Sequence, residues 1–292
     1  MDTIKSLLGE RKSMVQNNLI RVIIFSYKSK NLEAVVKLVT ENATSPLCID
    51  VVDKNTIDRR EAFSKYDHLS YQHQMWTKVD SPTEYKNSYL NGKEFDYFLI
   101  ISDDVLLPEN WDTKLFAMYK DGSIISGQGK TYLYNKNNFY LGKSSDTTES
   151  LTLNNFIDRN LIFGSAKTLL KVPYPTTVKY FGEEEMFSIN AFCEGVDVYS
   201  LPTGFYEDLN VRTLENMYTP FSKQHNYNRF IDLINDSSFG NVRSVGDFVE
   251  YHRVEISNIH KLPFERNDVA YDNENALRKD KGEKFFDRRG TV

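Results

Sequence analysis

The sequence predicts an α/β fold in which a mostly parallel central sheet is flanked by helices. The run at residues 97–101 has no polar interruption, which is typical of a strand that is buried on both faces. Residues 19–25 and 47–52, which are apolar except for Arg21 and Asp50, are also predicted to be strands. Between these two segments the chain changes to a helical pattern, so that strand, helix and strand follow one another. A parallel pair of strands needs a crossover of this kind, and we expect it to be right-handed.

The helix between the first two strands is predicted from the spacing of its apolar residues. Leu32, Val35, Val36 and Val39 follow the i, i+3, i+4, i+7 pattern that places apolar side chains on one face. Asn31 directly precedes them and belongs to a residue type that caps helix N-termini through its side chain. We therefore expect a helix that begins after Asn31 and packs on the sheet.

The rest of the chain extends this pattern with shorter segments. Gly195 follows a helical segment at residues 186–193 and is the expected C′ residue of that helix. Residues 54–80 are polar and show no clear pattern, and residues 127–150 are expected to form a long surface excursion. Further helices are expected at 84–91, 111–119, 165–170, 228–234 and 245–251, further strands at 123–126 and 196–201, and an ordered apolar run at 161–166.

The composition is that of an ordinary globular protein. Of the 292 residues, 40% are hydrophobic and 26% are charged, and the net charge of −5 provides no global attraction to nucleic acid, although it is compatible with a local basic groove. Cys48 and Cys193 are the only cysteines, which excludes a disulfide framework and favours a reducing compartment. Residues 1–18 lack the apolar core of a signal peptide, and no apolar run approaches the roughly 18 residues that span a bilayer. We expect a cytoplasmic protein without a membrane partner.

No internal repeat or linker divides the chain into separate folded units. We expect an N-terminal arm at residues 1–18, a single domain at 19–256 and a charged C-terminal extension at 257–292. A chain of this length buries an ample core in one α/β domain.

Two adjacent carboxylates, Asp103 and Asp104, follow the apolar run at residues 97–101. In an open α/β sheet, ligands bind beyond the carboxyl ends of the strands, so these acids stand where a site is expected. Neighbouring carboxylates repel each other unless a cation or hydrogen-bond donors offset their charge. Carboxylate oxygens suit Mg²⁺ or Mn²⁺, and Mg²⁺ is commonly shared with substrate phosphates. A solvated Asp-Asp turn is the alternative interpretation.

Several further segments follow one another in a recognisable order and spacing. They are 51–53, 81–87, 97–112, 162–166, 172–174, 181–184, 195–200 and 239–244. In this order and spacing they resemble the GT-A (Rossmann-like) fold of glycosyltransferases. No single segment is specific, but the ordered set most closely resembles the cytoplasmic polypeptide N-acetylglucosaminyltransferase family, which modifies hydroxyproline. The resemblance covers residues 20–256.

The resemblance implies a metal-dependent glycosyltransferase with a donor half at residues 19–126 and an acceptor half at 127–256. Such an enzyme moves a sugar from a nucleotide sugar, here a UDP-sugar, to a hydroxyl group. A divalent cation, Mn²⁺ or Mg²⁺, stabilises the negative charge that develops on the departing nucleotide diphosphate. The donor-binding residues that the resemblance implies are Ser26, Asp53, Lys86, Asp103 and Gly164.

The resemblance also implies particular roles at the donor site. Asp104 would bind the metal, and Asp103 would support it or contact the ribose. Asp53 would meet the nucleoside. Lys86 would face the diphosphate where the family has an arginine, an exchange that keeps the charge but loses the bidentate fork.

Glu183 and Glu184 are the catalytic candidates. They open a helix beside the expected site and would orient the acceptor or take part in proton transfer. The alternative is that these acids occur there because negative charge is favoured at a helix N-terminus.

Two departures from the family pattern concern the metal. Ser102 stands where the family has the first acid of its Asp-x-Asp motif, and the family's metal-binding histidine is absent from residues 204–212. Glu207 or Asp208 would replace it with a hard oxygen ligand; alternatively, the metal site has decayed. The competing hypothesis is therefore a GT-A domain that binds a nucleotide or glycan without catalysis, and a hydrolase built on the paired acids is a more distant one.

Residues 129–143 suggest an acceptor site, because lysines and aromatic residues are interleaved there without any acid. Lysines bind phosphates, and aromatic rings stack on bases or beside an extruded nucleotide, so one candidate acceptor is DNA with hydroxymethylated bases, as some bacteriophages make. The family implies a protein hydroxyl instead, and a third interpretation is a loop whose aromatic residues pack on the domain. The candidate acceptor-binding residues are Lys130, Tyr132, Lys136 and Tyr140.

Overall fold

The computed structural model describes the chain in several segments, which together contain the central sheet and its helices. The described residues are 18–27, 29–74, 86, 89–127, 130–135, 138–143, 150–153, 156–158, 160–174, 183–209 and 240–252. The helix expected at 228–234, the charged extension and all but the last residue of the N-terminal arm lie outside them. Among the helices that the structure describes, none has the length and apolar character required to cross a lipid bilayer.

The secondary structure alternates between strands and helices in the first half and then becomes more mixed. The first half contains β1 (Ile20–Tyr27), α2 (Leu32–Glu41), β2 (Leu47–Lys54), α3 (Arg60–Phe63), β3 (Leu69–Gln74), β4 (Tyr97–Ser102), β5 (Val105–Leu106), α5 (Trp111–Met118) and β6 (Ile124–Ser126). The second half contains β7 (Lys130–Asn135), β8 (Asn138–Lys143), β9 (Thr152–Leu153), β10 (Leu161–Ser165), α6 (Ala166–Lys171), α7 (Glu183–Cys193), β11 (Val198–Ser200), β12 (Glu207–Asp208) and α9 (Val245–His252).

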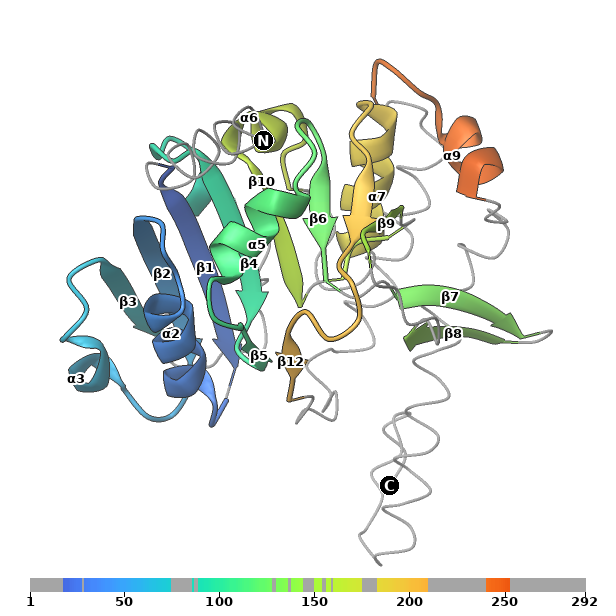
Figure 1. The fold of residues 1–292 in the computed structure, drawn as a ribbon. Coiled ribbons are helices and arrows are strands. Elements are labelled where there is room, and N and C mark those ends of the chain that lie inside the picture. Colours follow the sequence, from blue (N-terminus) through green and yellow to red (C-terminus); the bar gives the residue numbers. More distant parts are fainter. Residues whose placement is uncertain are drawn as a thin grey trace, which may run out of the picture.

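An eight-stranded sheet with the order β3-β2-β1-β4-β10-β6-β11-β9 forms the centre of the fold (Figure 1). The pairs β3–β2, β2–β1 and β1–β4 are parallel. β10 runs antiparallel to both β4 and β6. β11 is parallel to β6, and β9 is antiparallel to β11. These pairings confirm the predicted α/β fold, with the antiparallel strands in the second half of the chain. Because β10 lies between β4 and β6, the expected donor and acceptor halves share one sheet.

β1, α2 and β2 form the predicted strand–helix–strand unit. The two strands pair in parallel along their full length, from Ile20 opposite Leu47 to Tyr27 opposite Lys54. All four apolar residues predicted for the inner face of α2 are fully buried. Asn31 occupies the N-cap position, but its side chain makes no capping hydrogen bond. The sequence therefore predicted the position of Asn31 and not the partner of its side chain.

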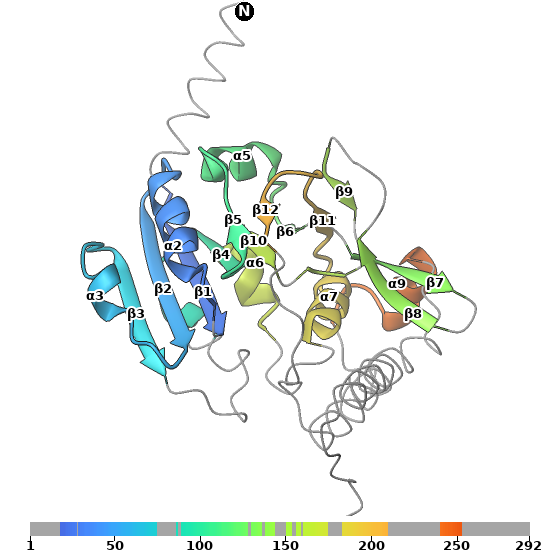
Figure 2. The ribbon, with the colours of Figure 1, turned by 90° about the horizontal axis from the view of Figure 1, so that it is seen from below.

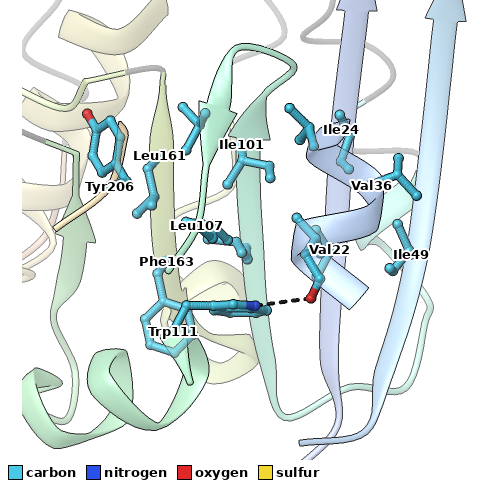
Figure 3. Packing of buried hydrophobic residues seen from close by; sticks show 14 of the residues in the cluster. Val22, Ile24, Val36, Ile49, Ile101, Leu107, Trp111, Leu161, Phe163 and Tyr206 are labelled. Carbon is cyan, nitrogen blue, oxygen red and sulfur yellow. Dashed lines mark hydrogen bonds between the residues drawn. The ribbon is translucent and has the colours of Figure 1, made fainter. Parts of the chain in front are cut away.

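Two apolar clusters fill the two faces of the sheet. Along β1, Ile24 contributes to the cluster that includes residues of α2 and α5, whereas Ile23 contributes to the cluster that includes residues of α7. Trp111, the first residue of α5, is fully buried in the cluster with α2, and its Nε1 donates a hydrogen bond to the carbonyl oxygen of Val39 at 3.0 Å (Figure 3). This bond joins α5 to α2 on one face of the sheet.

The C-terminal end of α7 confirms the predicted role of Gly195. Gly195 has a φ of 75°, in the left-handed region that glycine adopts without steric cost. Its N–H donates to the carbonyl oxygen of Phe192 at 2.9 Å, and the N–H of Val196 donates to that of Ala191 at 2.8 Å. This pair of bonds is a Schellman motif, which satisfies the last carbonyl groups of the helix.

The structure corrects the expectation for the two polar segments. Residues 54–80, for which no pattern was found, contain α3 and the edge strand β3. Within residues 127–150, for which a long surface excursion was expected, residues 130–135 and 138–143 pair as the antiparallel hairpin β7–β8. The hairpin is a separate two-stranded sheet on the side of the molecule that carries α7 and α9 (Figures 1 and 2). Edge strands and hairpins are solvated on at least one side, so their sequences lack the continuous apolar runs of the central strands.

Asp112, in the first turn of α5, ties this helix to the turn before β2. One carboxylate oxygen, Oδ2, accepts hydrogen bonds from the N–H of Thr44 at 2.9 Å, from the hydroxyl of Thr44 at 2.8 Å and from the N–H of Ser45 at 2.6 Å. Burial acts to raise the pKa of Asp112, but these hydrogen bonds outweigh it and hold the pKa below its ordinary value. The charged form is therefore the one that the folded state stabilises.

Replacing Asp112 with alanine should lower the free energy of unfolding at pH 7 by on the order of 2–3 kcal/mol, because hydrogen bonds to a charged group are lost. Since the folded pKa is lowered, the contribution is complete above the unfolded pKa of about 3.9 and is lost as the pH falls through the folded value. Urea unfolding at neutral and acidic pH measures the difference, which should shrink in acid. Asp121→Ala, at an exposed acid after the same helix, is the control; an equal loss in both variants would contradict the assignment.

Candidate active site

The carboxyl ends of β1, β2 and β4 meet at one edge of the sheet, the lower edge in Figure 1. The strand register places Ser26 opposite Asp53, and Ser102 opposite Phe25. Asp103 and Asp104 form the turn between β4 and β5, and their exposed fractions are 0% and 7%. This burial contradicts the interpretation of the two acids as a solvated turn.

A loop between β1 and α2 contacts both of these acids. The hydroxyl of Ser29 donates to the carbonyl oxygen of Asp103 at 3.3 Å. The side-chain amide of Asn31 donates to Oδ1 of Asp104 at 3.2 Å. The loop between β1 and α2 therefore holds both the backbone of Asp103 and the carboxylate of Asp104.

Asp53, at the end of β2, is fully buried and forms an ion pair. Its Oδ2 accepts hydrogen bonds from Nη1 of Arg59 at 2.8 Å and from the hydroxyl of Tyr71 at 3.0 Å. Nη2 of the same arginine donates to the carbonyl oxygen of Ser29 at 2.7 Å. Burial raises the pKa of Tyr71 to about 12, and the Asp53 carboxylate adds to the rise, so the phenol stays a donor. Arg59 thus joins the end of β2 to the loop that contacts Asp103 and Asp104.

Two buried polar atoms lie at this edge without a hydrogen-bond partner among the described residues. They are Oγ of Ser26 and Oδ1 of Asp53, on residues that are opposite each other in the β1–β2 ladder. Buried polar groups are normally hydrogen-bonded, and an exception requires an explanation such as a bound ligand. Both residues were predicted to bind the donor.

The segment in which the family histidine was expected lies beside Asp104. β12 pairs antiparallel with β5, so that Asp208 is opposite Val105, and the N–H of Leu209 donates to the carbonyl oxygen of Asp104 at 2.9 Å. Asp208 is half-buried and accepts a hydrogen bond from the amide of Asn160 at 3.1 Å, whereas Glu207 is exposed. The structure therefore places Glu207 and Asp208, the candidate replacements for the histidine, next to the turn that contains Asp103 and Asp104.

A divalent cation at this edge would have few protein ligands. Within the described part of the chain, no group of three or more His, Cys, Asp or Glu side chains is arranged to hold a metal ion. Mg²⁺ is commonly bound by one or two carboxylates with substrate phosphates and water. The donor set at Asp103 and Asp104 fits that kind of site and not a cage made by protein alone.

Lys86 and Glu183, predicted to act on the donor and in catalysis, contact each other beside Tyr174, which belongs to the apolar cluster that includes residues of α7. Nζ of Lys86 lies 2.5 Å from Oε1 of Glu183 and 3.1 Å from the hydroxyl of Tyr174, and all three side chains are buried. Nζ also lies 4.2 Å from the centre of the Tyr174 ring. Burial acts to lower the pKa of Lys86, but the Glu183 carboxylate outweighs it and raises the pKa well above its ordinary value. The structure thus gives Lys86 a carboxylate partner rather than an open face toward the diphosphate.

Glu184 differs from its neighbour in its surroundings. It is only half-buried, and its charge contributes to the raised pKa of Lys86, so its carboxylate lies near the same cation. Glu183 is almost fully buried and is the hydrogen-bond partner of Lys86. Of the two predicted catalytic acids, Glu184 is the more accessible to a substrate.

Gly164 lies away from the acidic turn. In the antiparallel β10–β4 pair it is opposite Phe98, near the start of β4, whereas Asp103 follows the end of that strand. A Cβ atom at this position would come within 3.0 Å of the Phe98 ring. The requirement for glycine is therefore explained by sheet packing, and we leave Gly164 out of the donor site proposed below.

Three of the predicted acceptor residues lie on the strands of the hairpin. In its register, Lys130 is opposite Lys143, Tyr132 is opposite Leu141 and Tyr140 is opposite Leu133. Lys136 lies outside the described residues. Tyr132 and Tyr140, which the sequence analysis grouped together, are therefore on different strands and are not opposite each other.

Sequence reasoning missed four residues of the site. Arg59 and Tyr71 lie in the segment without a recognisable pattern, and Asn31 was expected to cap its own helix. Asn160 directly precedes β10, which brings it to the acidic edge because that strand runs antiparallel to β4. Asn160 directly precedes a strand and was open to prediction from that position, whereas Tyr71 lies inside β3 and Arg59 directly precedes α3, where no such signal exists.

Comparison with known proteins adds to the description of the fold. No family model and no curated protein matches the sequence. Among solved structures, the crystal structure of S. aureus TarS 1-349 in complex with UDP-GlcNAc is similar to this chain, with a TM-score of 0.53 and 14% sequence identity. The match covers 77% of this chain and 68% of that chain. This similarity shows that the chain shares the α/β, Rossmann-like fold of that structure.

Proposed function

We propose that the protein transfers a sugar from a nucleotide sugar to a hydroxyl group of a macromolecule. The observation that carries the proposal is the burial of Asp103 and Asp104 at the carboxyl edge of a sheet of glycosyltransferase type. TarS, which has a similar fold, is in complex with UDP-GlcNAc, and this supports a UDP-sugar as the donor. We carry forward, as part of the proposal, the resemblance of the ordered segments to the cytoplasmic polypeptide N-acetylglucosaminyltransferase family.

In this proposal the residues of the acidic edge bind the donor. Ser26 and Asp53 present their buried polar atoms to the nucleoside, and Asp103 and Asp104 face the diphosphate. Asp104, with Glu207 or Asp208 beside it, would hold Mn²⁺ or Mg²⁺ together with diphosphate oxygens. When bound, the cation would neutralise the charge that develops on the diphosphate.

The transfer step exchanges one bond of the anomeric carbon for another. The bond from this carbon to the diphosphate oxygen breaks, the acceptor oxygen bonds to the carbon, and the acceptor proton passes to a carboxylate. We assign this carboxylate to Glu184, because Glu183 is held by Lys86. Lys86 in turn keeps the start of α7 in place rather than binding the diphosphate.

The acceptor is proposed to bind at the hairpin β7–β8, where Lys130, Tyr132 and Tyr140 lie on the two strands, with Lys136 as a further candidate. The lysines would bind phosphates and the tyrosines would stack on bases if the acceptor is DNA with hydroxymethylated bases. A protein hydroxyl is the other acceptor that we carry forward. Transfer to hydroxymethylated DNA and to a hydroxyproline peptide, measured side by side, separates the two.

The proposed activity is tested with a panel of nucleotide sugars. The cognate donor should raise the stability of the folded protein by about 2.7 kcal/mol at a concentration 100 times its Kd. The same donor should be hydrolysed slowly in the presence of Mn²⁺, because water can replace the acceptor. Binding without any hydrolysis or transfer would identify the catalytically degenerate module instead. Absence of binding by every nucleotide sugar would contradict both.

A further inference from the structure

We propose that Asn31 is a positioning residue of the donor site, which holds the carboxylate of Asp104 through its side-chain amide. The inference rests on the proposed function, because it gives Asn31 a part in binding the nucleotide diphosphate. Neither the helical pattern of the sequence nor the resemblance to a family assigns Asn31 such a part.

The first observation is that Asn31 does not do what an N-cap asparagine normally does. The side-chain oxygen of an N-cap residue usually accepts a hydrogen bond from the second or third N–H of its helix. At the start of α2 this bond is absent, and only the backbone carbonyl of Asn31 makes the expected bond, to the N–H of Val35 at 3.0 Å. The side chain is directed instead to Oδ1 of Asp104, 73 residues further along the chain.

The second observation is that the backbone around Asn31 is itself fixed. The N–H of Asn31 donates to the hydroxyl of Ser29 at 3.0 Å, and this hydroxyl contacts the carbonyl oxygen of Asp103. Arg59 holds the carbonyl of Ser29 from the other side and is anchored on Asp53. The amide of Asn31 is thus presented to Asp104 by a loop that has hydrogen bonds to β2 and β4 segments.

The third observation is a contrast between the acids at the same edge. Asp53 is paired with the guanidinium of Arg59, which offsets its negative charge. Asn31, by comparison, gives Asp104 a neutral donor. An amide fixes the orientation of a carboxylate and brings no positive charge of its own, which suits a carboxylate that is to hold a cation beside a diphosphate. The donors that these two acids receive from Asn31 and Arg59 therefore differ in charge.

Asn42 provides a matched control at the opposite end of the same helix. It is the C-cap residue of α2, and its side-chain amide donates to the carbonyl oxygen of Leu107 at 2.8 Å. Asn31 and Asn42 are thus the same residue type at the two ends of one helix, and both reach the segment that follows β4. Only Asn31 contacts an acid of the proposed site.

The experiment compares Asn31→Ser and Asn42→Ser in the full-length protein. Serine caps a helix N-terminus as well as asparagine does, so Asn31→Ser should leave the free energy of unfolding close to that of the wild type. It should weaken UDP binding in the presence of Mn²⁺ by about 10–100-fold, as expected when the partner of a metal ligand is removed. Asn42→Ser should leave UDP affinity unchanged. Asn31→Asp, which replaces the donor with a like charge, should weaken binding more than Asn31→Ser.

Titration calorimetry and urea unfolding give the two readouts. Wild-type UDP affinity in Asn31→Ser would overturn the inference and leave the proposed function standing. An equal loss of affinity in both serine variants would also overturn it, because the effect would then come from the helix and not from Asp104. Absence of UDP binding by the wild-type protein would overturn the proposed function itself, and the inference with it.

Discussion

Replacing Asp104 with alanine should reduce sugar transfer by at least about 10²–10³-fold, the loss seen when one group that stabilises transition-state charge is removed. Asp104 follows the central strand β4, is 7% exposed and lies beside β12. Without its carboxylate, the site would hold less firmly the cation that would neutralise the charge on the departing diphosphate. Initial rates of transfer and of donor hydrolysis, with and without Mn²⁺, measure the effect.

Glu109→Ala is the control for this variant. Glu109 is an exposed acid in the same segment, five residues after Asp104, and its removal changes the net charge equally. It should retain wild-type turnover. If Asp104→Ala also retains metal-dependent turnover, or if both variants lose it equally, the assignment of Asp104 is wrong.

Replacing Lys86 with methionine should lower the free energy of unfolding by about 3–5 kcal/mol, because the buried carboxylate of Glu183 loses its charged partner. Both side chains are less than a tenth exposed, and their closest atoms are 2.5 Å apart. The raised pKa of Lys86 means that the pair contributes fully below the unfolded lysine pKa of about 10.4 and is lost only as the pH rises through the higher folded value. Urea unfolding at neutral pH is the measurement.

Two further variants show whether burial of the pair is the cause. Lys37→Met removes an exposed lysine that pairs with Glu41 at 3.8 Å, and it should cost no more than about 0.5 kcal/mol. Lys86→Met combined with Glu183→Leu should recover much of the loss, since replacing both members of a buried pair is often tolerated. A small effect of Lys86→Met alone would contradict the buried pairing of Lys86 with Glu183.

The central part of the fold could be predicted because its signals are local. β1, β2 and β4 are buried on both faces, which requires apolar runs, and α2 shows the spacing of a helix with one buried face. Gly195 was predictable from the same kind of reasoning, because a left-handed residue after a helix favours glycine. These elements follow from residue type and spacing alone.

β3 and the hairpin β7–β8 were missed for the opposite reason. β3 is an edge strand in which Leu69, Tyr71 and His73 are half-buried, whereas Ser70 and Gln72 are exposed, so apolar character is diluted. Among the described strands, β7 and β8 pair only with each other. The continuous apolar pattern of the central strands is absent from their sequences. Strands that are stabilised by pairing rather than by burial have weaker sequence signals.

The sequence predicted which edge of the sheet carries the candidate site, but not which side chains contact one another there. Asp103, Asp104 and Asp53 were identified because acids directly after buried strands lie at the carboxyl edge of a parallel sheet. The pairing of Asp53 with Arg59, and of Lys86 with Glu183, depends on how segments pack in three dimensions. From the sequence, Arg59 was assigned no partner, and Lys86 was assigned to the diphosphate and not to Glu183.

The most direct test of the proposed donor site is a crystal structure of the protein with UDP-GlcNAc and Mn²⁺. The account predicts that the uridine lies near Ser26 and Asp53 at the ends of β1 and β2. It predicts that the diphosphate lies at Asp103 and Asp104, with Asn31 still bonded to Asp104. A nucleotide bound elsewhere, with the carboxyl edge of β1, β2 and β4 unchanged and empty, would contradict the account.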